Sequence, residues 1–258
     1  MTVHDAARGF ERAADAYDRG RPEYPPEAVA RVAAALRLRP GVRLLDAGAG
    51  TGKLSRLVAA AGAAVFAADP AEPMIRRLAG APGIVPLRAV AEALPFRDGA
   101  FDAAAAASAF HWFDGPRALR ELYRVQRAGG RLALLWNARD DAEPWVARLS
   151  EIVNRREGRA PRHRTGAWRA AFDAAPGLFA AIDEAHVRHV HALSPAAALD
   201  RVASISFVAA MPDAERGEVL AEVRALLASH PDTAGRAELA LPYRTDVHVY
   251  ERPGGPPR

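Results

Sequence analysis

Hydrophobic residues in the first 140 or so positions follow two alternating spacings. Short apolar runs, such as Leu44–Leu45 and Val65–Ala68, are typical of strands that are buried on both faces. Between these runs, apolar residues recur every three or four positions, as on one face of a helix. Strands that alternate with helices through short loops predict a doubly wound, mostly parallel α/β sheet.

The same pattern sets approximate bounds for each element. The predicted strands of this half are 44–46, 65–69, 84–89, an alanine-rich run that ends at Ser108, and 131–136. The predicted helices are 26–38, 53–61, a short one from Pro73 and one from Pro116. The alanine-rich run is helical by propensity. It follows a turn at Asp98-Gly99, however, and it leads into the aromatic residues at 110–113, so we interpret it as a buried strand.

After Asn137 the pattern changes. Helical spacing predicts helices around 145–153, 195–203 and 212–228, and a further amphipathic segment opens at Trp168. Alternating residues at 185–192 and 243–250 predict two late strands.

Composition narrows the possible classes of function. The 258 residues are 50% hydrophobic and 26% charged, which is enough for one large domain with a substantial core. The absence of cysteine excludes disulfides, thiolate metal sites and a cysteine nucleophile, and it fits an intracellular protein. No run is long and apolar enough to predict a membrane span, and the N-terminus lacks the apolar core of a signal peptide. We therefore expect a cytoplasmic protein without a membrane partner.

A net charge of +4 and a pI near 9.9 are compatible with nucleic-acid binding. Lys53 is, however, the only lysine, and the arginines are spread along the chain among Asp and Glu. Arginines in that arrangement usually form a solvated surface. We therefore expect no nucleic-acid partner.

The stretch from Leu44 to Leu54 carries the strongest functional signal. An apolar run ends at Asp46, glycines follow at 48, 50 and 52, and a helical pattern then begins. Glycines at a strand-to-helix turn let a ligand approach the backbone, and the helix N-terminus offers unpaired N–H groups. A second predicted strand ends at Asp69, about twenty residues on, where a ribose-binding carboxylate is expected in this geometry. The stretch predicts a nucleoside cofactor, and the alternative is a tight turn that binds nothing.

Four blocks of sequence resemble the class I S-adenosylmethionine-dependent methyltransferases, and within them the small-molecule branch of the trans-aconitate methyltransferases. The blocks are 17–25, 46–52, 91–96 leading to 109–113, and 124–130 leading to 136–140. The resemblance implies a Rossmann-like sheet of seven strands with an antiparallel last strand, and helical lid elements from the N-terminal arm and the C-terminal half. It also implies one methyltransferase domain over 1–258, divided into an arm and first helix at 1–38, a cofactor-binding core at 41–140, substrate-side helices and the last two strands at 141–251, and a flexible tail at 252–258.

The resemblance further implies where S-adenosylmethionine binds, with S-adenosylhomocysteine as the product. The implied cofactor residues are Tyr17, Arg21, Asp46, Gly48, Ala49, Gly50, Asp69, Pro70, Met74, Ala91, Glu92 and Ser108. Among them, Asp69 would hold both ribose hydroxyls, and Asp46 would lie beside the amino-acid half of the cofactor. Many relatives place an acid where this chain has Val90, so a side-chain contact to the adenine amine is not expected from that position.

The implied substrate side consists of His111, Trp112, Trp136 and Arg139. His111 is either a general base for a hydroxyl acceptor or a wall of the pocket. Arg21 and Arg139 either clamp an acidic substrate or form surface ion pairs. His189 and His191 would share one face of a strand while His186 points away, and no carboxylate has a spacing that joins them, so we expect no metal site.

These features favour methyl transfer to a small molecule, on an oxygen of a carboxylate or a hydroxyl. A carboxylate acceptor would need no base. One alternative is an NAD(P)-dependent oxidoreductase on a related sheet, which the glycine spacing and Asp46 disfavour. Another is a protein that binds S-adenosylmethionine without catalysis. Either a monomer or a homodimer is compatible with the sequence.

Overall fold

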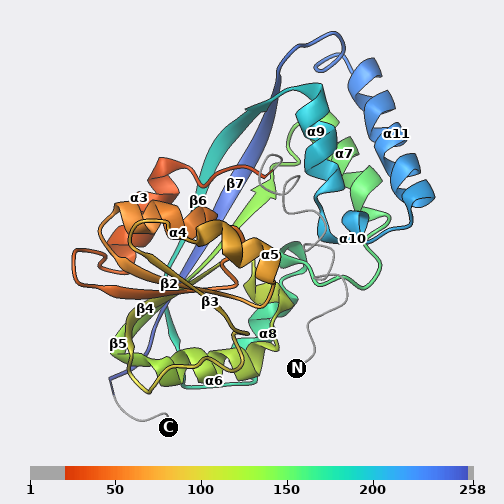
Figure 1. The fold of residues 1–258 in the computed structure, drawn as a ribbon. Coiled ribbons are helices and arrows are strands. Elements are labelled where there is room, and N and C mark those ends of the chain that lie inside the picture. The colour runs from red at the N-terminus through yellow and green to blue at the C-terminus, as the bar shows by residue number, and fades with distance from the viewer. Residues whose placement is uncertain (1–20, 255–258) are drawn as a thin grey trace. The chain divides into compact units, whose positions relative to one another are not determined.

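The computed structural model of the protein describes residues 21–254. Its strands form one seven-stranded sheet in the order β3-β2-β1-β4-β5-β7-β6 (Figure 1). The strands are β1 (Arg43–Ala47), β2 (Ala64–Asp69), β3 (Ile84–Arg88), β4 (Phe101–Ala107), β5 (Gln126–Arg139), β6 (Ala180–Leu193) and β7 (Leu239–Glu251). β1 to β5 pair in parallel. β7 runs antiparallel to β5, since Gly129 N donates to Arg252 O and Arg252 N donates to Gly130 O. The predicted sheet of seven strands with an antiparallel last strand is confirmed.

Contacts within the chain divide it into two compact units. The core unit comprises Tyr24–Trp136, Pro161–Val187 and residues 245–254. The helical unit comprises residues 21–23, Asn137–Ala160 and Arg188–Arg244. β5, β6 and β7 each begin in one unit and end in the other. The interpretation of the chain as a single domain stays a prediction.

The core unit buries its strands on both faces. Leu44 belongs to an apolar cluster with Val32 and Val58, whereas the next residue, Leu45, belongs to a second cluster with Leu119. Successive side chains of a strand point to opposite faces, so one short apolar run supplies both clusters. Figure 1 shows helices on both faces of this sheet. The helices of the unit are α3 (Pro26–Ala35), α4 (Lys53–Ala60), α5 (Glu72–Ile75), α6 (Gly115–Val125) and α8 (Ala170–Asp173), with 3₁₀ turns η2 (Arg76–Leu78), η3 (Phe110–Trp112), η4 (His163–Thr165) and η5 (Ala167–Arg169).

The helical unit has an apolar cluster of its own. Its helices are α7 (Pro144–Asn154), α9 (Pro195–Ala203), α10 (Ser206–Ala209) and α11 (Asp213–Ser229). Leu149 of α7, Val202 of α9 and Val223 of α11 are buried in this cluster together with Tyr243 of β7. On the outside, Arg155 Nη2 lies 2.6 Å from Glu222 Oε2 and ties α7 to α11. The unit is therefore held by interior apolar contacts and by ion pairs at its surface.

Several elements differ from the sequence-based bounds. The alanine-rich run is β4, as predicted. β5 begins at Gln126 instead of Arg131, because Gly129 and Gly130 take part in the ladder with Arg252 instead of ending an element. β6 and β7 are also longer than predicted, and the short helix α10 was not predicted.

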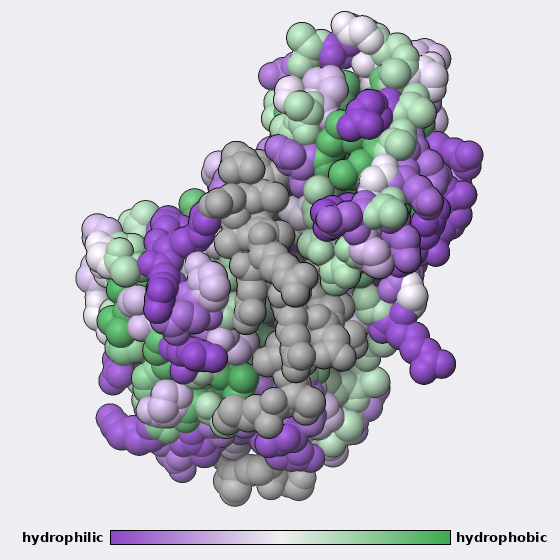
Figure 2. Space-filling model, turned by 45° about the vertical axis from the view of Figure 1, so that its right-hand side comes forward, coloured by the Kyte–Doolittle hydropathy of each residue, from purple (hydrophilic) through white to green (hydrophobic). Residues whose placement is uncertain are grey.

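Hydrophilic and hydrophobic residues are interspersed over the surface of both units that Figure 2 shows. Among residues 21–254, the exposed large hydrophobic residues are Val85, Ile182 and Val190. Between residues 21 and 254, no helix is both long enough and apolar enough to cross a membrane.

Candidate functional site

The parallel register brings three polar residues to one edge of the core unit. Asp46 of β1 is level with Ala105 of β4, and Ala47 is level with Ala68 of β2. Asp46, Asp69 and Ser108 therefore all lie at or just beyond the carboxyl ends of adjacent strands. In open α/β sheets this edge is where ligands bind.

The glycine turn after β1 has the geometry that the sequence predicted. Gly48, Gly50 and Gly52 have φ values of 71°, 57° and 82°, a region that side chains rarely adopt. A Cβ on Gly48 would lie 2.5 Å from the Cβ of Ala109, and one on Gly52 would lie 2.2 Å from Leu78 Cδ2. Space as well as conformation therefore requires glycine at both positions.

Asp69 links the glycine turn to the turn after β2. Its Oδ2 accepts a hydrogen bond from Gly50 N and its Oδ1 accepts one from Ala71 N, both at 2.8 Å. Burial raises the pKa of Asp69, and the two backbone hydrogen bonds act against that rise. Each carboxylate oxygen can accept a second hydrogen bond. Asp69 is therefore fixed in orientation and could still receive both hydroxyls of a ribose.

Asp46 is the most deeply buried acid of the site. Its side chain has no exposed surface, and its Oδ2 accepts a 2.6 Å hydrogen bond from Ser55 Oγ on α4. Its Oδ1 is buried and has no hydrogen-bond partner in the part of the chain that the structure describes. Burial raises the pKa of Asp46 to about 6. A buried carboxylate oxygen that lacks a partner is costly, so this atom fits a ligand that brings an N–H donor or a positive charge, such as the amino-acid half of S-adenosylmethionine.

Ser108 follows β4 in an unusual backbone conformation. Its φ is 54°, one of two positive values at non-glycine residues within the described part of the chain. Its amide donates to Leu135 O at 2.7 Å, and its Oγ lies 3.1 Å from Tyr24 Oη. Residues held in this region often lie at functional sites. Tyr24 is 7% exposed, as an anchor of the entering chain should be, but its contact with Ser108 could not be seen in the sequence.

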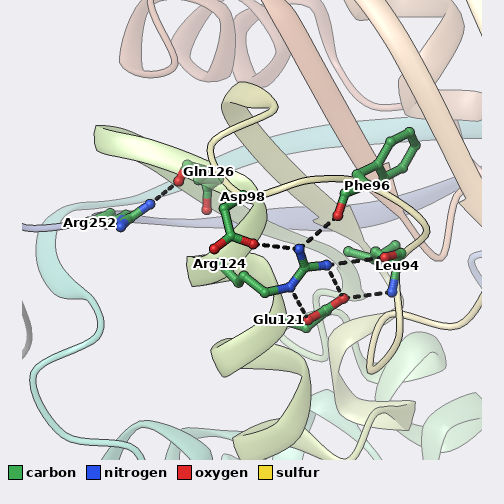
Figure 3. A network of polar contacts seen from close by, with 7 residues as sticks. All are labelled: Leu94, Phe96, Asp98, Glu121, Arg124, Gln126 and Arg252. Atoms are coloured by element: carbon green, nitrogen blue, oxygen red, sulfur yellow. Dashed lines mark hydrogen bonds and ion pairs between the residues drawn. The ribbon is translucent and has the colours of Figure 1, made fainter.

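A polar network fixes the loop that follows β3 (Figure 3). Arg124 Nη1 donates to Phe96 O at 2.7 Å and to Asp98 at 2.8 Å. Glu121 Oε1 accepts from Leu94 N at 2.8 Å, and the Arg124 guanidinium lowers the pKa of Glu121. At the amino end of β5, Arg252 donates to the carbonyl of Gln126 (Figure 3). Two side chains of α6 therefore hold the loop that carries the adenine-side candidates.

The remaining cofactor candidates lie close to these turns. Ala91 is 4% exposed, and Glu92 Oε1 accepts from Asp114 N at 2.8 Å. Met74, on α5, is buried, and its Cε would lie 3.5 Å from a Cβ placed on Gly50. Pro70 follows Asp69, and its carbonyl accepts from Arg88 Nε at 3.2 Å. Met74 and Pro70 therefore border the same turns as Asp46 and Asp69, and Glu92 is fixed by the residue that precedes α6.

His111 and Trp136 are joined by a hydrogen bond. Trp136 Nε1, near the end of β5, lies 3.0 Å from His111 Nδ1. An indole N–H can only donate, so Nδ1 must accept, and a neutral His111 then carries its proton on Nε2. The Trp136 ring also stacks on His163, with centroids 4.3 Å apart and planes 15° apart. Trp112, in η3, lies beside His111 with ring centroids 5.0 Å apart.

Not all predicted site residues are brought together in this way. Arg139 and Arg21 belong to the helical unit, and Tyr17 lies outside the described residues. Arg139 Nε donates to Ser150 Oγ at 2.9 Å, and that hydroxyl donates to Asp141 Oδ1 at 2.6 Å. Arg139 therefore supports the start of α7.

Some contacts of the site were not predicted from the sequence. Ser55 contacts Asp46, and Tyr24 contacts Ser108. His163, Trp168 and His248 gather around Trp136, and Trp168 is 6% exposed. Across residues 21–254, no three His, Cys, Asp or Glu side chains are grouped so that they could hold a metal ion.

Comparisons with known proteins agree with this geometry. Residues 45–134 match the family model of a methyltransferase domain. The chain is 42% identical over 243 residues to an uncharacterized methyltransferase of Mycobacterium tuberculosis, which covers 93% of this chain and 94% of that protein. A demethylmenaquinone methyltransferase of Thermus thermophilus is 50% identical over 101 residues, which are 36% of this chain and 46% of that protein.

A solved structure from Anaeromyxobacter dehalogenans, provisionally described as a type II methyltransferase, has a TM-score of 0.69 at 26% identity. The match covers 92% of this chain and 99% of that one. The full-length relative, the family model and the fold favour methyl transfer over the nicotinamide alternative. The chain therefore belongs to the class I S-adenosylmethionine-dependent methyltransferases, and S-adenosylmethionine is its cofactor.

Proposed function

We propose that the methyl acceptor is a small acidic molecule and that the methylated atom is a carboxylate oxygen. The hydrogen bond from Trp136 to His111 carries this proposal. S-adenosylmethionine supplies a methyl group on a sulfonium, which is already activated for displacement. The protein then contributes alignment, exclusion of water and, where the acceptor needs it, a base.

The proposed cofactor site is the carboxyl edge of the core unit. Asp69 binds the two ribose hydroxyls through the lone pairs that Gly50 N and Ala71 N leave available. Asp46 Oδ1 binds the amino-acid half of the cofactor, together with the backbone of Gly48 to Gly50. Met74 and Pro70 flank the adenine, Ala91 and Glu92 line its edge, and Ser108 lies beside the methionine portion.

The state of His111 distinguishes the two acceptor classes. A hydroxyl acceptor must lose a proton, and a base needs an unprotonated nitrogen to take it. Nδ1 of His111 already accepts from Trp136, and Nε2 carries the proton of the neutral ring. His111 is therefore prepared to donate a hydrogen bond through Nε2. A carboxylate matches this donor, since its oxygen attacks the methyl carbon while the sulfur–carbon bond breaks, and no proton has to be removed.

Matched variants of His111 test this assignment. In His111→Gln the amide N–H replaces the donor at Nε2, so activity on an acidic acceptor should stay within about tenfold of wild type. His111→Ala and His111→Asn lack a donor at that reach and should lose on the order of tenfold to a hundredfold. The measurement is transfer of labelled methyl from S-adenosylmethionine to a panel of mono-, di- and tricarboxylates, phenols and quinols.

Two outcomes would contradict the proposal. A base role would make His111→Gln as inactive as His111→Ala. Methylation of a quinol or a phenol, with no methylation of any acid in the panel, would show that the acceptor is not a carboxylate. The panel includes quinols because a demethylmenaquinone methyltransferase is similar to part of this chain.

A further inference from the structure

The helical unit contains a buried arginine whose charge is not matched by any described acid. Arg201 lies on α9, and only 7% of its surface is exposed. Its Nε donates to Tyr243 Oη at 3.1 Å, and its Nη1 is buried without a hydrogen-bond partner among the described residues. Within residues 21–254, no ion pair joins Arg201 to a carboxylate.

The surroundings of Arg201 make this arrangement unusual. Tyr243 is 1% exposed and belongs to the apolar cluster of the helical unit, with Trp145 and Phe207. The ring of His189 stacks on Tyr243 with centroids 5.7 Å apart. In the same unit, Arg155 lies 2.6 Å from Glu222, and it does so at the surface, where an unpaired arginine would cost little. Arg201, which is buried, therefore lacks the carboxylate partner that Arg155 has at the surface.

A buried guanidinium without an anionic partner is destabilising, because burial removes the water that would solvate the charge. A buried arginine of this kind is less costly when a bound ligand supplies the missing acceptor. With Nε directed to Tyr243, the edge formed by Nη1 and Nη2 remains, and this edge matches the two oxygens of a carboxylate. The planar edge therefore favours a carboxylate group over a neutral group.

We propose that Arg201 and Tyr243 form a binding site for the carboxylate of a small molecule inside the helical unit. The guanidinium binds both carboxylate oxygens through its Nη edge. Tyr243 accepts from Nε and thereby fixes the plane of the guanidinium. If the carboxylate belongs to the methyl acceptor, the site binds the substrate, and this role rests on the function proposed above. If it belongs to a molecule that is not methylated, the site regulates the protein.

The test uses tricarballylate, a small tricarboxylate, with the full-length protein and chloride at matched ionic strength as the control. Binding is measured by calorimetric titration and by the shift in melting temperature, without S-adenosylmethionine. Wild type should bind, and Arg201→Met should lose binding by on the order of tenfold to a hundredfold. Arg201→Lys, which keeps the charge but lacks the fork, should bind more weakly than wild type, and Tyr243→Phe should show an intermediate loss. Arg155→Met serves as the matched control and should bind like wild type.

Three results would overturn the proposal. Wild type and Arg201→Met could bind equally, or wild type could show no binding. Alternatively, binding could appear only after Asp5, Glu11, Asp15 and Asp18 are replaced by their amides, which would assign the guanidinium to an acid of this chain. If Arg201→Met fails to fold, Arg201→Lys and Tyr243→Phe still decide the question.

Turnover separates this proposal from the proposed function. If the acceptor supplies the carboxylate, Arg201→Met should raise the KM for the acid and leave the KM for S-adenosylmethionine unchanged. If tricarballylate binds through Arg201 but no acid is methylated, the site stands and the proposed acceptor class fails. If acids are methylated equally well by Arg201→Met, the acceptor class stands and the site fails as its binding determinant.

Discussion

In the core unit and in the helical unit, a charged residue that is buried as a whole has a side-chain atom that no described residue satisfies. In the core unit it is Oδ1 of Asp46, and in the helical unit it is Nη1 of Arg201. Asp46 lies at a turn that is shaped by backbone groups and glycines. Arg201 is oriented by a single side chain, Tyr243, from a strand 42 positions away. The comparison teaches that one site is built by local backbone and the other by distant side chains.

The largest effect should come from disturbing the backbone-built site. Gly48→Ala combines a φ of 71° with a Cβ 2.5 Å from that of Ala109, so it should lower the free energy of unfolding by about 3 kcal/mol and abolish S-adenosylmethionine binding. Gly41→Ala is the matched control, because its φ is 90° but nothing lies within 4 Å of the added Cβ. It should cost about 1 kcal/mol and leave binding unchanged. Equal losses in urea unfolding would show that space at Gly48 is not limiting.

A second effect concerns the charge of Asp46. Its folded-state pKa is raised to about 6, above the ordinary 3.8, so the native state binds the extra proton and wild type loses stability as the pH rises from about 4 to about 6. Asp46→Asn should therefore be more stable than wild type by about 3 kcal/mol above pH 6, and the difference should vanish near pH 4. Unfolding of both proteins across this range measures it. The same variant should bind S-adenosylmethionine more weakly, so a variant that is less stable at pH 7 would contradict the assignment.

The smallest effect should be seen in affinity. Asp69→Asn keeps an acceptor for only one of the two backbone amides, those of Gly50 and Ala71, and it weakens the contact with the ribose, so S-adenosylmethionine should bind on the order of tenfold to a hundredfold less tightly. Asp102→Asn is the control. Asp102 also accepts from a backbone amide, that of Arg43 at 2.7 Å, but it lies at the opposite ends of β4 and β1. Equal losses of affinity in the two variants, measured by titration, would mean that Asp69 has no special contact with the cofactor.

The two units also differ in how far the sequence predicted them. Gly48 and Gly50 were predicted to form the turn after the first strand, and they do, because the turn is decided by conformational preferences of neighbouring residues. β4 was predicted in spite of its alanines, because the turn before it and the aromatic residues after it fixed its ends.

Contacts between distant residues could not be predicted from the sequence. Tyr24 and Ser108 are 84 positions apart, and Arg201 and Tyr243 are 42 apart. Periodicity predicts which face of an element is buried, but not which polar group meets it across the interior. For the same reason, the hydrogen bond from Arg139 Nε to Ser150 was not predicted, and the position of Arg139 on the substrate side stays a prediction.

The position of β7 in the sheet affects how the protein folds while it is being synthesised. β7 pairs between β5 and β6, although it is the last strand to be synthesised. Until residues 239–251 have left the ribosome, β5 has an unpaired edge and β6 has no neighbour in the sheet. The strands that carry Asp46, Asp69 and Ser108 can pair much earlier, since β1, β2 and β4 all lie within the first 107 residues. The nascent protein therefore completes its cofactor turns while half of its sheet is still open to aggregation, and this period is when it most needs a chaperone.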